Sequence, residues 1–236
     1  MRLVYGSTFA LALALLVPVG MHAQMDHGQQ ETARKVENGG VHAAGWQGMV
    51  DPTESGQSVN DAKLEMQGKD LHVVTGPAIA YWNPANKASG DYTVKATFSE
   101  PKYMNLNDHP HPYGIVIGGN DMGTPQASYL YCAAYGNGTF IVRGFGPAAF
   151  AAGGNRRPQA NEAVHKAAGK DQPVTQEVAM SVKGDTVTCS INGTQVASYP
   201  KSELVGAGKL KSTDGVYGVR FAHNTEGSVS GLSVSK

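Results

Sequence analysis

Residues 129–145 constrain the fold of this chain more than any other segment. Two runs of alternating residues flank a Gly-Asn-Gly connection, which suits a type I turn closed by a glycine in the left-handed region. A turn of this length predicts a β-hairpin that sets Tyr131 opposite Arg143 and Tyr129 opposite Phe145. The segment therefore indicates antiparallel β-structure.

Side chains alternate along a strand, so the predicted hairpin has two chemically different faces. One face is apolar and comprises Leu130, Cys132, Ala134, Phe140 and Val142. The other face carries Tyr129, Tyr131, Arg143 and Phe145. Aromatic rings and a planar cation with several donors suit a polar ring such as a sugar. We interpret this second face as a ligand-binding platform; the alternative is that the tyrosines cap the core and the arginine is solvated.

Short alternating runs separated by turn residues continue through the rest of the chain. They predict strands at residues 71–74, 79–82, 92–98, 177–182, 186–191, 195–199, 216–221 and 229–234. Residues 113–117 are apolar without alternation, which predicts a strand covered on both faces. The 30 glycines and the charged fraction of 16% favour tight turns over long helices. In the excursion between strands at residues 146–173, residues 161–168 have a pattern that allows one or two helical turns. The chain is thus expected to be all-β, as an antiparallel two-sheet sandwich.

The amino terminus has the features of a signal peptide over residues 1–23. Arg2 supplies the positive start, Phe9–Val19 is apolar, and Ala23 is a small residue before a cut. The apolar run is shorter than the roughly 20 residues that span a bilayer, so no membrane insertion of the mature chain is expected. We predict export to the periplasm or the cell exterior, a flexible polar lead at residues 24–40, and a sandwich domain at residues 41–236.

The charge balance limits the classes of partner that the protein can bind, and the two cysteines raise the question of a disulfide. The 19 basic and 19 acidic residues balance, which excludes a general attraction to nucleic acid. Cys132 and Cys189 both fall on inward faces of predicted strands. Opposing sheets lie about 10 Å apart, beyond the reach of a disulfide. We therefore expect buried free thiols, with a disulfide as the alternative if the two strands are neighbours.

Several motifs resemble the concanavalin A-like jelly roll. They are Gly90-Asp91-Tyr92-Thr93-Val94, Tyr113–Gly119, Val182–Val187, Ile191–Thr194, Gly215–Arg220 and Gly231–Val234. Within that superfamily, the chain from about Trp46 onward most resembles the 3-keto-disaccharide hydrolase domain family, which is glycoside hydrolase family 16-like. The resemblance implies a jelly-roll sandwich with a concave face, where relatives often bind glycans. Some lectins of this fold also bind Ca²⁺.

The family resemblance implies a hydrolase, but no residue can be assigned to that reaction. Retaining glucanases of the superfamily carry a Glu-x-Asp-x-x-Glu cluster, which sets two carboxyl groups about 5–5.5 Å apart. The glutamates of this chain are scattered instead. The sequence also lacks a Gly-x-Ser-x-Gly elbow, a phosphate-binding loop and an HExxH motif. The catalytic residues remain unassigned.

Residues 107–113 are rich in histidine and proline. Because proline favours extended backbone at the residue before it, His109 and His111 are expected to point the same way. Such a pair has the spacing to share a metal ion, with Asp108 or Asp121 adding an oxygen ligand. Three ligands are normally needed and only two are evident, so we expect no metal and no cofactor. We expect both rings to donate to ligand hydroxyls at the mouth of the concave face; exposed imidazoles on a rigid loop are the alternative.

Five further residues are candidate ligand contacts on or beside predicted strands. Tyr113 adjoins the histidine segment. Asn120 and Asp121 follow Gly118-Gly119, where small residues let a ligand approach closely; simple turn chemistry is the alternative. Arg220 lies near the end of a strand that the resemblance places near the concave face, and His223 follows it; a surface strand end is the alternative.

These observations leave three hypotheses open. The first is an exported carbohydrate-binding protein that holds a glycan or small polar ligand on its aromatic face. The second is an enzyme that acts on glycosidic bonds of ordinary or 3-keto-disaccharides. The third is a cell-envelope interaction module, which predicts an exposed flat apolar patch and no small ligand.

Overall fold

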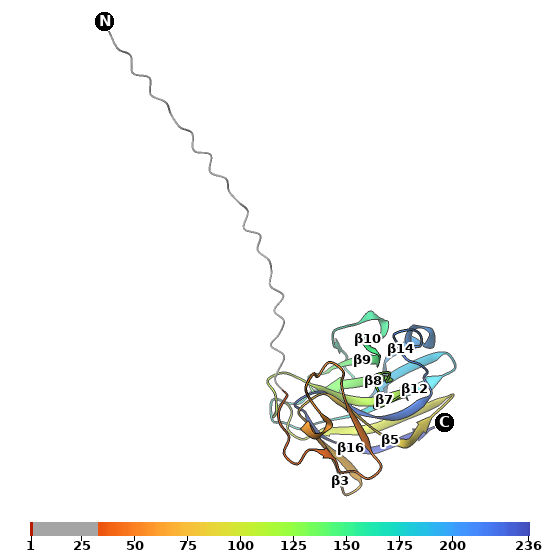
Figure 1. Ribbon diagram of the computed structural model, residues 1–236, viewed down its shortest axis with the longest axis horizontal. Helices are drawn as coiled ribbons and strands as arrows, with labels where there is room; N and C mark the ends of the chain where they lie inside the picture. The colour runs from red at the N-terminus through yellow and green to blue at the C-terminus, as the bar shows by residue number, and fades with distance from the viewer. Residues whose placement is uncertain (2–32) are drawn as a thin grey trace. The chain divides into compact units, whose positions relative to one another are not determined.

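Two sheets packed face to face account for most of residues 33–236 (Figure 1). The computed structural model describes Met1 and residues 33–236. The predicted signal peptide, apart from Met1, and residues 24–32 of the predicted lead lie outside the described residues. Between the strands of these described residues the pairing is antiparallel, except that β1 runs parallel to β3. The expectation of an all-β, two-sheet jelly-roll sandwich is confirmed.

The first sheet has the strand order β1-β3-β4-β16-β6-β12-β13-β14. Its strands are β1 (Gly40–Val41), β3 (Ala62–Gln67), β4 (Asp70–Thr75), β16 (Glu226–Ser235), β6 (Tyr92–Glu100), β12 (Val174–Lys183), β13 (Thr186–Ile191) and β14 (Thr194–Pro200). The turn between β13 and β14 contains Asn192 and Gly193 with φ values of 50° and 79°. Two positive φ values in succession are what a type I′ hairpin turn requires.

The second sheet has the order β10-β9-β8-β7-β15-β5-β2, and β11 pairs with β9 outside this path. Its strands are β10 (Ala148–Ala151), β9 (Thr139–Gly146), β8 (Ser128–Tyr135), β7 (Pro112–Asn120), β15 (Gly215–Phe221), β5 (Ile79–Ala88), β2 (Gln47–Val50) and β11 (Gln159–Ala160). Among the residues that the structure describes, helical structure is limited to η1 (Val59–Asp61), η2 (Ala152–Gly154) and α1 (Lys201–Leu204). No described helix is long and apolar enough to cross a membrane.

The hairpin of β8 and β9 has the predicted register. Tyr131 pairs with Arg143 and Tyr129 pairs with Phe145. Gly138 in the turn has a φ of 89°, the left-handed conformation that the turn type predicted. The face predicted to be apolar lies in the core between the sheets, with Leu130, Cys132, Ala134, Phe140 and Val142.

Residues 161–168 do not form the helical turns allowed by the sequence. They adopt turns and an isolated bridge, and Val164 is buried. The side chain of Gln176 on β12 accepts a hydrogen bond from His165 N at 3.0 Å and donates one to His165 O at 2.8 Å. A distant side chain thus satisfies the backbone groups that a helix would have paired internally.

Cys132 on β8 and Cys189 on β13 form a disulfide between the two sheets, with a Cα–Cα distance of 6.1 Å. The expectation of free thiols is therefore wrong. It assumed a uniform separation of about 10 Å between the sheets, but twisted sheets approach each other unevenly. At this point the two strands are within disulfide reach although they belong to different sheets.

We expect loss of the disulfide to destabilise the protein. The two cysteines are 57 residues apart in the sequence, and the chain-entropy relation gives about 4 kcal/mol for closing such a loop. Reduction, or the Cys132→Ala/Cys189→Ala variant, should lower the free energy of unfolding by about that amount in urea denaturation. An unchanged unfolding midpoint in both cases would contradict a stabilising bond.

Glu100 should make stability depend on pH. This side chain is buried beside Tyr113 and Tyr103, and burial raises its pKa from 4.5 to about 7. In the unfolded chain Glu100 ionises near pH 4.5, while in the fold it stays protonated until about pH 7. Its contribution is therefore fully present at low pH and is lost as the pH rises through that window, by on the order of 3 kcal/mol.

The Glu100→Gln variant keeps the hydrogen-bonding shape without the charge. We expect it to match the original protein near pH 4.5 and to be the more stable of the two at pH 8. Denaturant unfolding at several pH values measures this difference. A difference between the two proteins that does not change with pH would rule out the role of Glu100.

Candidate functional site

The outer face of the second sheet carries the predicted aromatic platform, but the rings are covered. Tyr129, Tyr131 and Phe145 are 0%, 4% and 5% exposed. They form a second apolar cluster on this face with Ala80 and Val116, separate from the core between the sheets. The ring centroids of Tyr129 and Phe145 are 5.2 Å apart. The expected side is correct, but the expectation of an open stacking platform is wrong.

A buried ion pair explains why the platform is closed. The guanidinium carbon of Arg220 on β15 lies 4.4 Å from the centroid of the Tyr131 ring, in a cation–π contact. Arg220 Nε donates to Asp51 Oδ2 at 3.2 Å, and Nη2 donates to the same oxygen. The hydroxyl of Tyr129 donates to Asp51 Oδ1 at 2.9 Å. The protein's own arginine thus occupies the place above Tyr131 where a sugar ring was expected.

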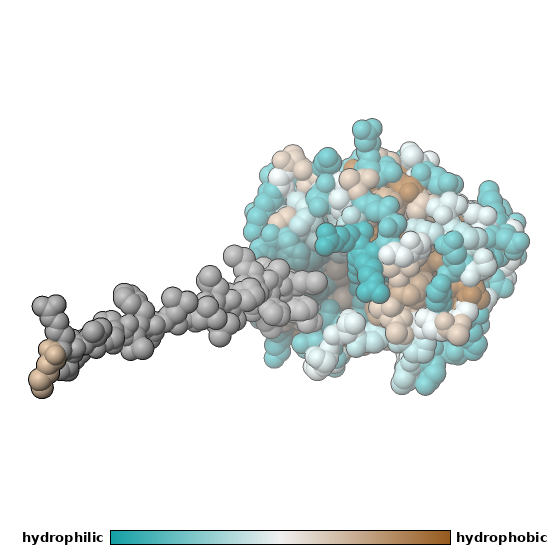
Figure 2. Space-filling model, turned by 90° about the horizontal axis from the view of Figure 1, so that it is seen from above, coloured by the Kyte–Doolittle hydropathy of each residue, from teal (hydrophilic) through white to brown (hydrophobic). Residues whose placement is uncertain are grey.

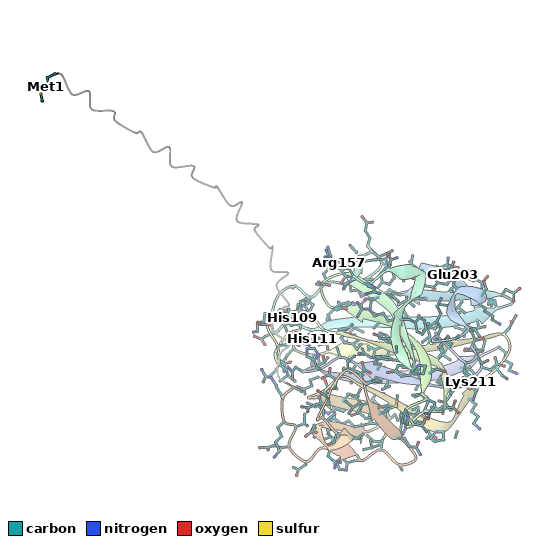
Figure 3. All side chains as sticks on the ribbon, turned by 45° about the horizontal axis from the view of Figure 1, so that its top comes forward. Met1, His109, His111, Arg157, Glu203 and Lys211 are labelled. Atoms are coloured by element: carbon teal, nitrogen blue, oxygen red, sulfur yellow. A yellow bond between two sulfur atoms is a disulfide. The ribbon has the colours of Figure 1, made fainter. Side chains whose placement is uncertain are left out.

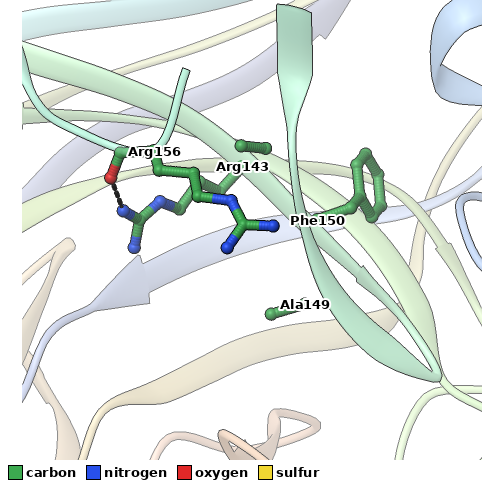
Figure 4. Close-up of a pocket in the computed structure, with 5 residues that line it drawn as sticks. Arg143, Ala149, Phe150 and Arg156 are labelled. Atoms are coloured by element: carbon green, nitrogen blue, oxygen red, sulfur yellow. Dashed lines mark hydrogen bonds between the residues drawn. The ribbon is translucent and has the colours of Figure 1, made fainter. Parts of the chain in front are cut away.

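Arg143 is the member of the platform that remains partly exposed. It lines a pocket of about 250 Å³ together with Ala149, Phe150 and Ala151 of β10 and Arg156 of the following loop (Figure 4). Arg143 Nη2 donates a hydrogen bond to the backbone oxygen of Arg156. The excursion after β9 therefore folds back beside the arginine and builds the pocket wall.

A second group of polar side chains gathers at one end of the second sheet. His109 and His111 precede β7, and His223 follows β15. Because β7 and β15 are paired neighbours, with Phe221 opposite Tyr113, their ends bring these histidines together. One ring nitrogen of each residue lies within 4.8 Å of the other two.

Each histidine of this cluster is oriented through its Nδ1 atom. His109 Nδ1 lies 2.8 Å from Asp108 Oδ1, and His111 Nδ1 lies 2.5 Å from the backbone oxygen of His223. His223 Nδ1 lies 3.6 Å from Glu54 Oε1. Burial, together with the His223 and His109 rings, lowers the pKa of His111 to about 3. His111 is therefore a neutral imidazole at physiological pH.

Asn120 and Asp121 do not join either group. They lie at the other end of β7 and line a different pocket of about 430 Å³. Asn120 Nδ2 donates to Asp214 O at 2.8 Å, and Asp121 forms an ion pair with Lys211 at 3.0 Å. Figure 3 shows Lys211 at one end of the folded unit and the two labelled histidines at the other. The candidate ligand contacts around β7 therefore do not form one site, because the histidines lie at one end of the strand and Asn120 and Asp121 lie at the other.

Tyr113 is not available as a ligand contact, which corrects its place among the candidates. Its side chain faces the core between the sheets, is 1% exposed, and stacks on Phe98 with ring centroids 5.7 Å apart. Strand alternation explains the outcome, because Tyr113 shares its face with Ile115 and Ile117.

Three residues that shape these sites were missed from the sequence. Asp51 and Glu54 follow β2 in a segment without a recognisable motif, and each acts on a partner more than 160 residues away. Arg156 stood out as half of an Arg-Arg pair in the excursion. That pair was a usable signal for a charged pocket wall, although the sequence did not place it beside Arg143.

Comparisons with known proteins agree on the fold. No family model matches the chain, and no curated protein matches it. A protein of unknown function with a galectin-like fold from Bacillus subtilis has 13% identity and a TM-score of 0.53, covering 80% of this chain and 88% of its own. This likeness shows a shared galectin-like β-sandwich fold, while the resemblance to the 3-keto-disaccharide hydrolase domain stays an expectation.

Two further solved structures have lower similarity. The endo-β-1,3-glucanase from Pyrococcus furiosus has 12% identity and a TM-score of 0.49, covering 80% of this chain and 87% of its own. The carbohydrate binding module CBM66 from Bacillus subtilis has 9% identity and a TM-score of 0.46, covering 83% of this chain and 98% of its own.

Removing one member of the buried ion pair should be costly. Asp51→Leu leaves Arg220 buried without its carboxylate, so we expect the free energy of unfolding to fall by about 3–5 kcal/mol. The Asp51→Leu/Arg220→Met double variant should recover much of this loss, since two apolar side chains replace two charges. Urea denaturation measures both, with Lys95→Ala at an exposed ion pair as the control. Equal losses in the single and double variants would contradict this account.

Proposed function

We propose that this protein is an exported carbohydrate-binding protein whose pocket at Arg143 and Arg156 holds an acidic sugar. The observation that carries the proposal is the pair of arginines lining one pocket. Neither forms an ion pair with a described carboxylate, and no acidic residue is among the described lining residues. Planar guanidinium groups bind carboxylates through two parallel hydrogen bonds, so this pocket favours an anionic group.

The rest of the pocket favours a small ring over an extended chain. Its volume of about 250 Å³ is near the lower limit of ordinary ligand pockets. Ala149, Ala151 and Phe150 give it an apolar wall, against which the C–H groups of a sugar can pack. A uronic acid residue combines the carboxylate and the apolar ring face. We therefore propose one acidic sugar, at the end of a glycan or free, as the ligand.

Two observations bear on the alternatives. A glycosidase normally needs two carboxyl groups at the bond it cleaves, and the described residues lining this pocket supply none.

An interaction module needs an exposed apolar patch, yet the described large hydrophobic residues with high exposure are Met1, Met66 and Val234. Figure 2 shows hydrophilic residues over most of the visible face. The disulfide supports export, because such bonds persist in oxidising compartments.

A glycan array with the purified protein tests the proposal. We expect retention of glycans that end in a uronic acid, and weaker retention at high salt because the binding is electrostatic. Arg143→Ala should weaken binding about 10- to 100-fold, the value of a hydrogen bond to a charged group.

Arg157→Ala is the matched control, because it removes the same charge from the exposed neighbour of Arg156 and leaves the lining residues intact. Circular dichroism checks that each variant is folded. Retention of neutral glycans alone, or equal effects of Arg143→Ala and Arg157→Ala, would refute an acidic-sugar site at this pocket.

A further inference from the structure

We propose that His109, His111 and His223 bind one divalent transition-metal ion, in a site separate from the sugar pocket. The sequence alone did not show that a third histidine, His223, lies beside the other two. His223 lies more than a hundred residues from the other two, and the pairing of β7 with β15 brings it to them.

The spacing of the three rings suits a metal. His109 Nε2 and His111 Nε2 are 2.9 Å apart, and the three ligating nitrogens all lie within 4.8 Å of one another. In a tetrahedral zinc site with Zn–N bonds of about 2.0–2.1 Å, the nitrogens are separated by about 3.4 Å. This separation lies between the 2.9 Å of the His109–His111 pair and the 4.8 Å within which all three nitrogens fall.

The hydrogen-bond partners select which nitrogen is the ligand. Asp108 Oδ1 and the His223 carbonyl can only accept hydrogen bonds, so hydrogens on His109 Nδ1 and His111 Nδ1 satisfy them. His111 Nδ1 also lies 3.1 Å from Asn107 Nδ2, but the His223 carbonyl is closer, at 2.5 Å. The Nε2 atoms of the two rings then face each other at 2.9 Å. A metal ion bound by both atoms would take the place of the hydrogen that two ring nitrogens at this distance otherwise share.

The third ring completes the pattern. His223 Nδ1 faces Glu54 Oε1 at 3.6 Å, which leaves Nε2 as the ligating atom. That Nε2 atom is buried and has no hydrogen-bond partner among the described residues. Buried polar atoms are almost always paired, so an orphaned nitrogen calls for an explanation. Carboxylate or carbonyl partners on the far nitrogen of ligating histidines are the usual support of a metal site.

The donor set indicates the class of metal. Three imidazoles suit Zn²⁺, Co²⁺, Ni²⁺ or Cu²⁺ and do not suit Ca²⁺ or Mg²⁺, which prefer oxygen. His109 is 53% exposed and His223 is 25% exposed on their side chains, so an ion has access from solvent. Three protein ligands leave a fourth position for water or a ligand oxygen.

Metal binding by the purified full chain tests the proposal. After dialysis against a chelator, we expect titration calorimetry with Zn²⁺ to give one site per chain. Co²⁺ should give visible absorption bands of a tetrahedral site, a readout that needs no activity. His109→Ala removes an exposed ligand and should weaken Zn²⁺ binding at least about 10-fold without unfolding, as should His223→Ala.

His165→Ala is the matched control, since this exposed histidine lies outside the cluster and bonds to Thr175 O. Glu54→Gln tests the supporting carboxylate and should weaken the site about 10- to 100-fold while leaving the three ligands in place. No stoichiometric Zn²⁺ binding, or binding that the His109 and His223 variants leave unchanged, would overturn the proposal. Because the assay needs no glycan, its outcome is independent of the sugar site.

Discussion

The buried pair of Asp51 and Arg220 determines the outer face of the second sheet. Burial of two charges is tolerated only because each is fully engaged: Asp51 accepts from Arg220 and from Tyr129, and Arg220 also lies over Tyr131. The pair joins the carboxyl-terminal end of β15 to the segment after β2. It thereby closes the aromatic face to ligands and anchors the segment that carries Glu54 to the histidine cluster.

Strand-level structure was predictable because it depends on local pattern. Alternation and turn chemistry were sufficient for the register of β8 and β9 and for the buried face of the hairpin. The covering of Tyr131 was not predictable, because Arg220 and Asp51 are 169 residues apart and no local pattern links them. The absence of helical turns at residues 161–168 was unpredictable for the same reason, because a residue from elsewhere in the chain decides it. Gln176 on β12 forms hydrogen bonds with the backbone N and O atoms of His165.

The candidate sites were predictable only in part, for a reason of topology. His109, His111 and Arg143 could be selected from their own neighbourhoods, because residue type and spacing carry the signal. Their partners His223 and Arg156 depend on which strands are neighbours and on where a long excursion returns. Asn120 shows the converse, since it is near the histidines in the sequence yet lies at the far end of β7. Local sequence pattern thus identifies individual site residues, whereas the pairing of distant strands decides which of them share a site.

The disulfide has a consequence for the sheet that carries Arg143. Cys132 is adjacent to Tyr131 on β8, and its sulfur is tied to β13 beneath. The disulfide therefore holds β8, the strand that pairs with Arg143, through its core-facing side, which is opposite the side that carries its aromatic rings. In reducing surroundings this backing is lost, and only non-covalent packing then holds β8 against the other layer. The rigidity of the pocket lined by Arg143 and Arg156 is therefore expected to depend on the redox state of the compartment in which the protein resides.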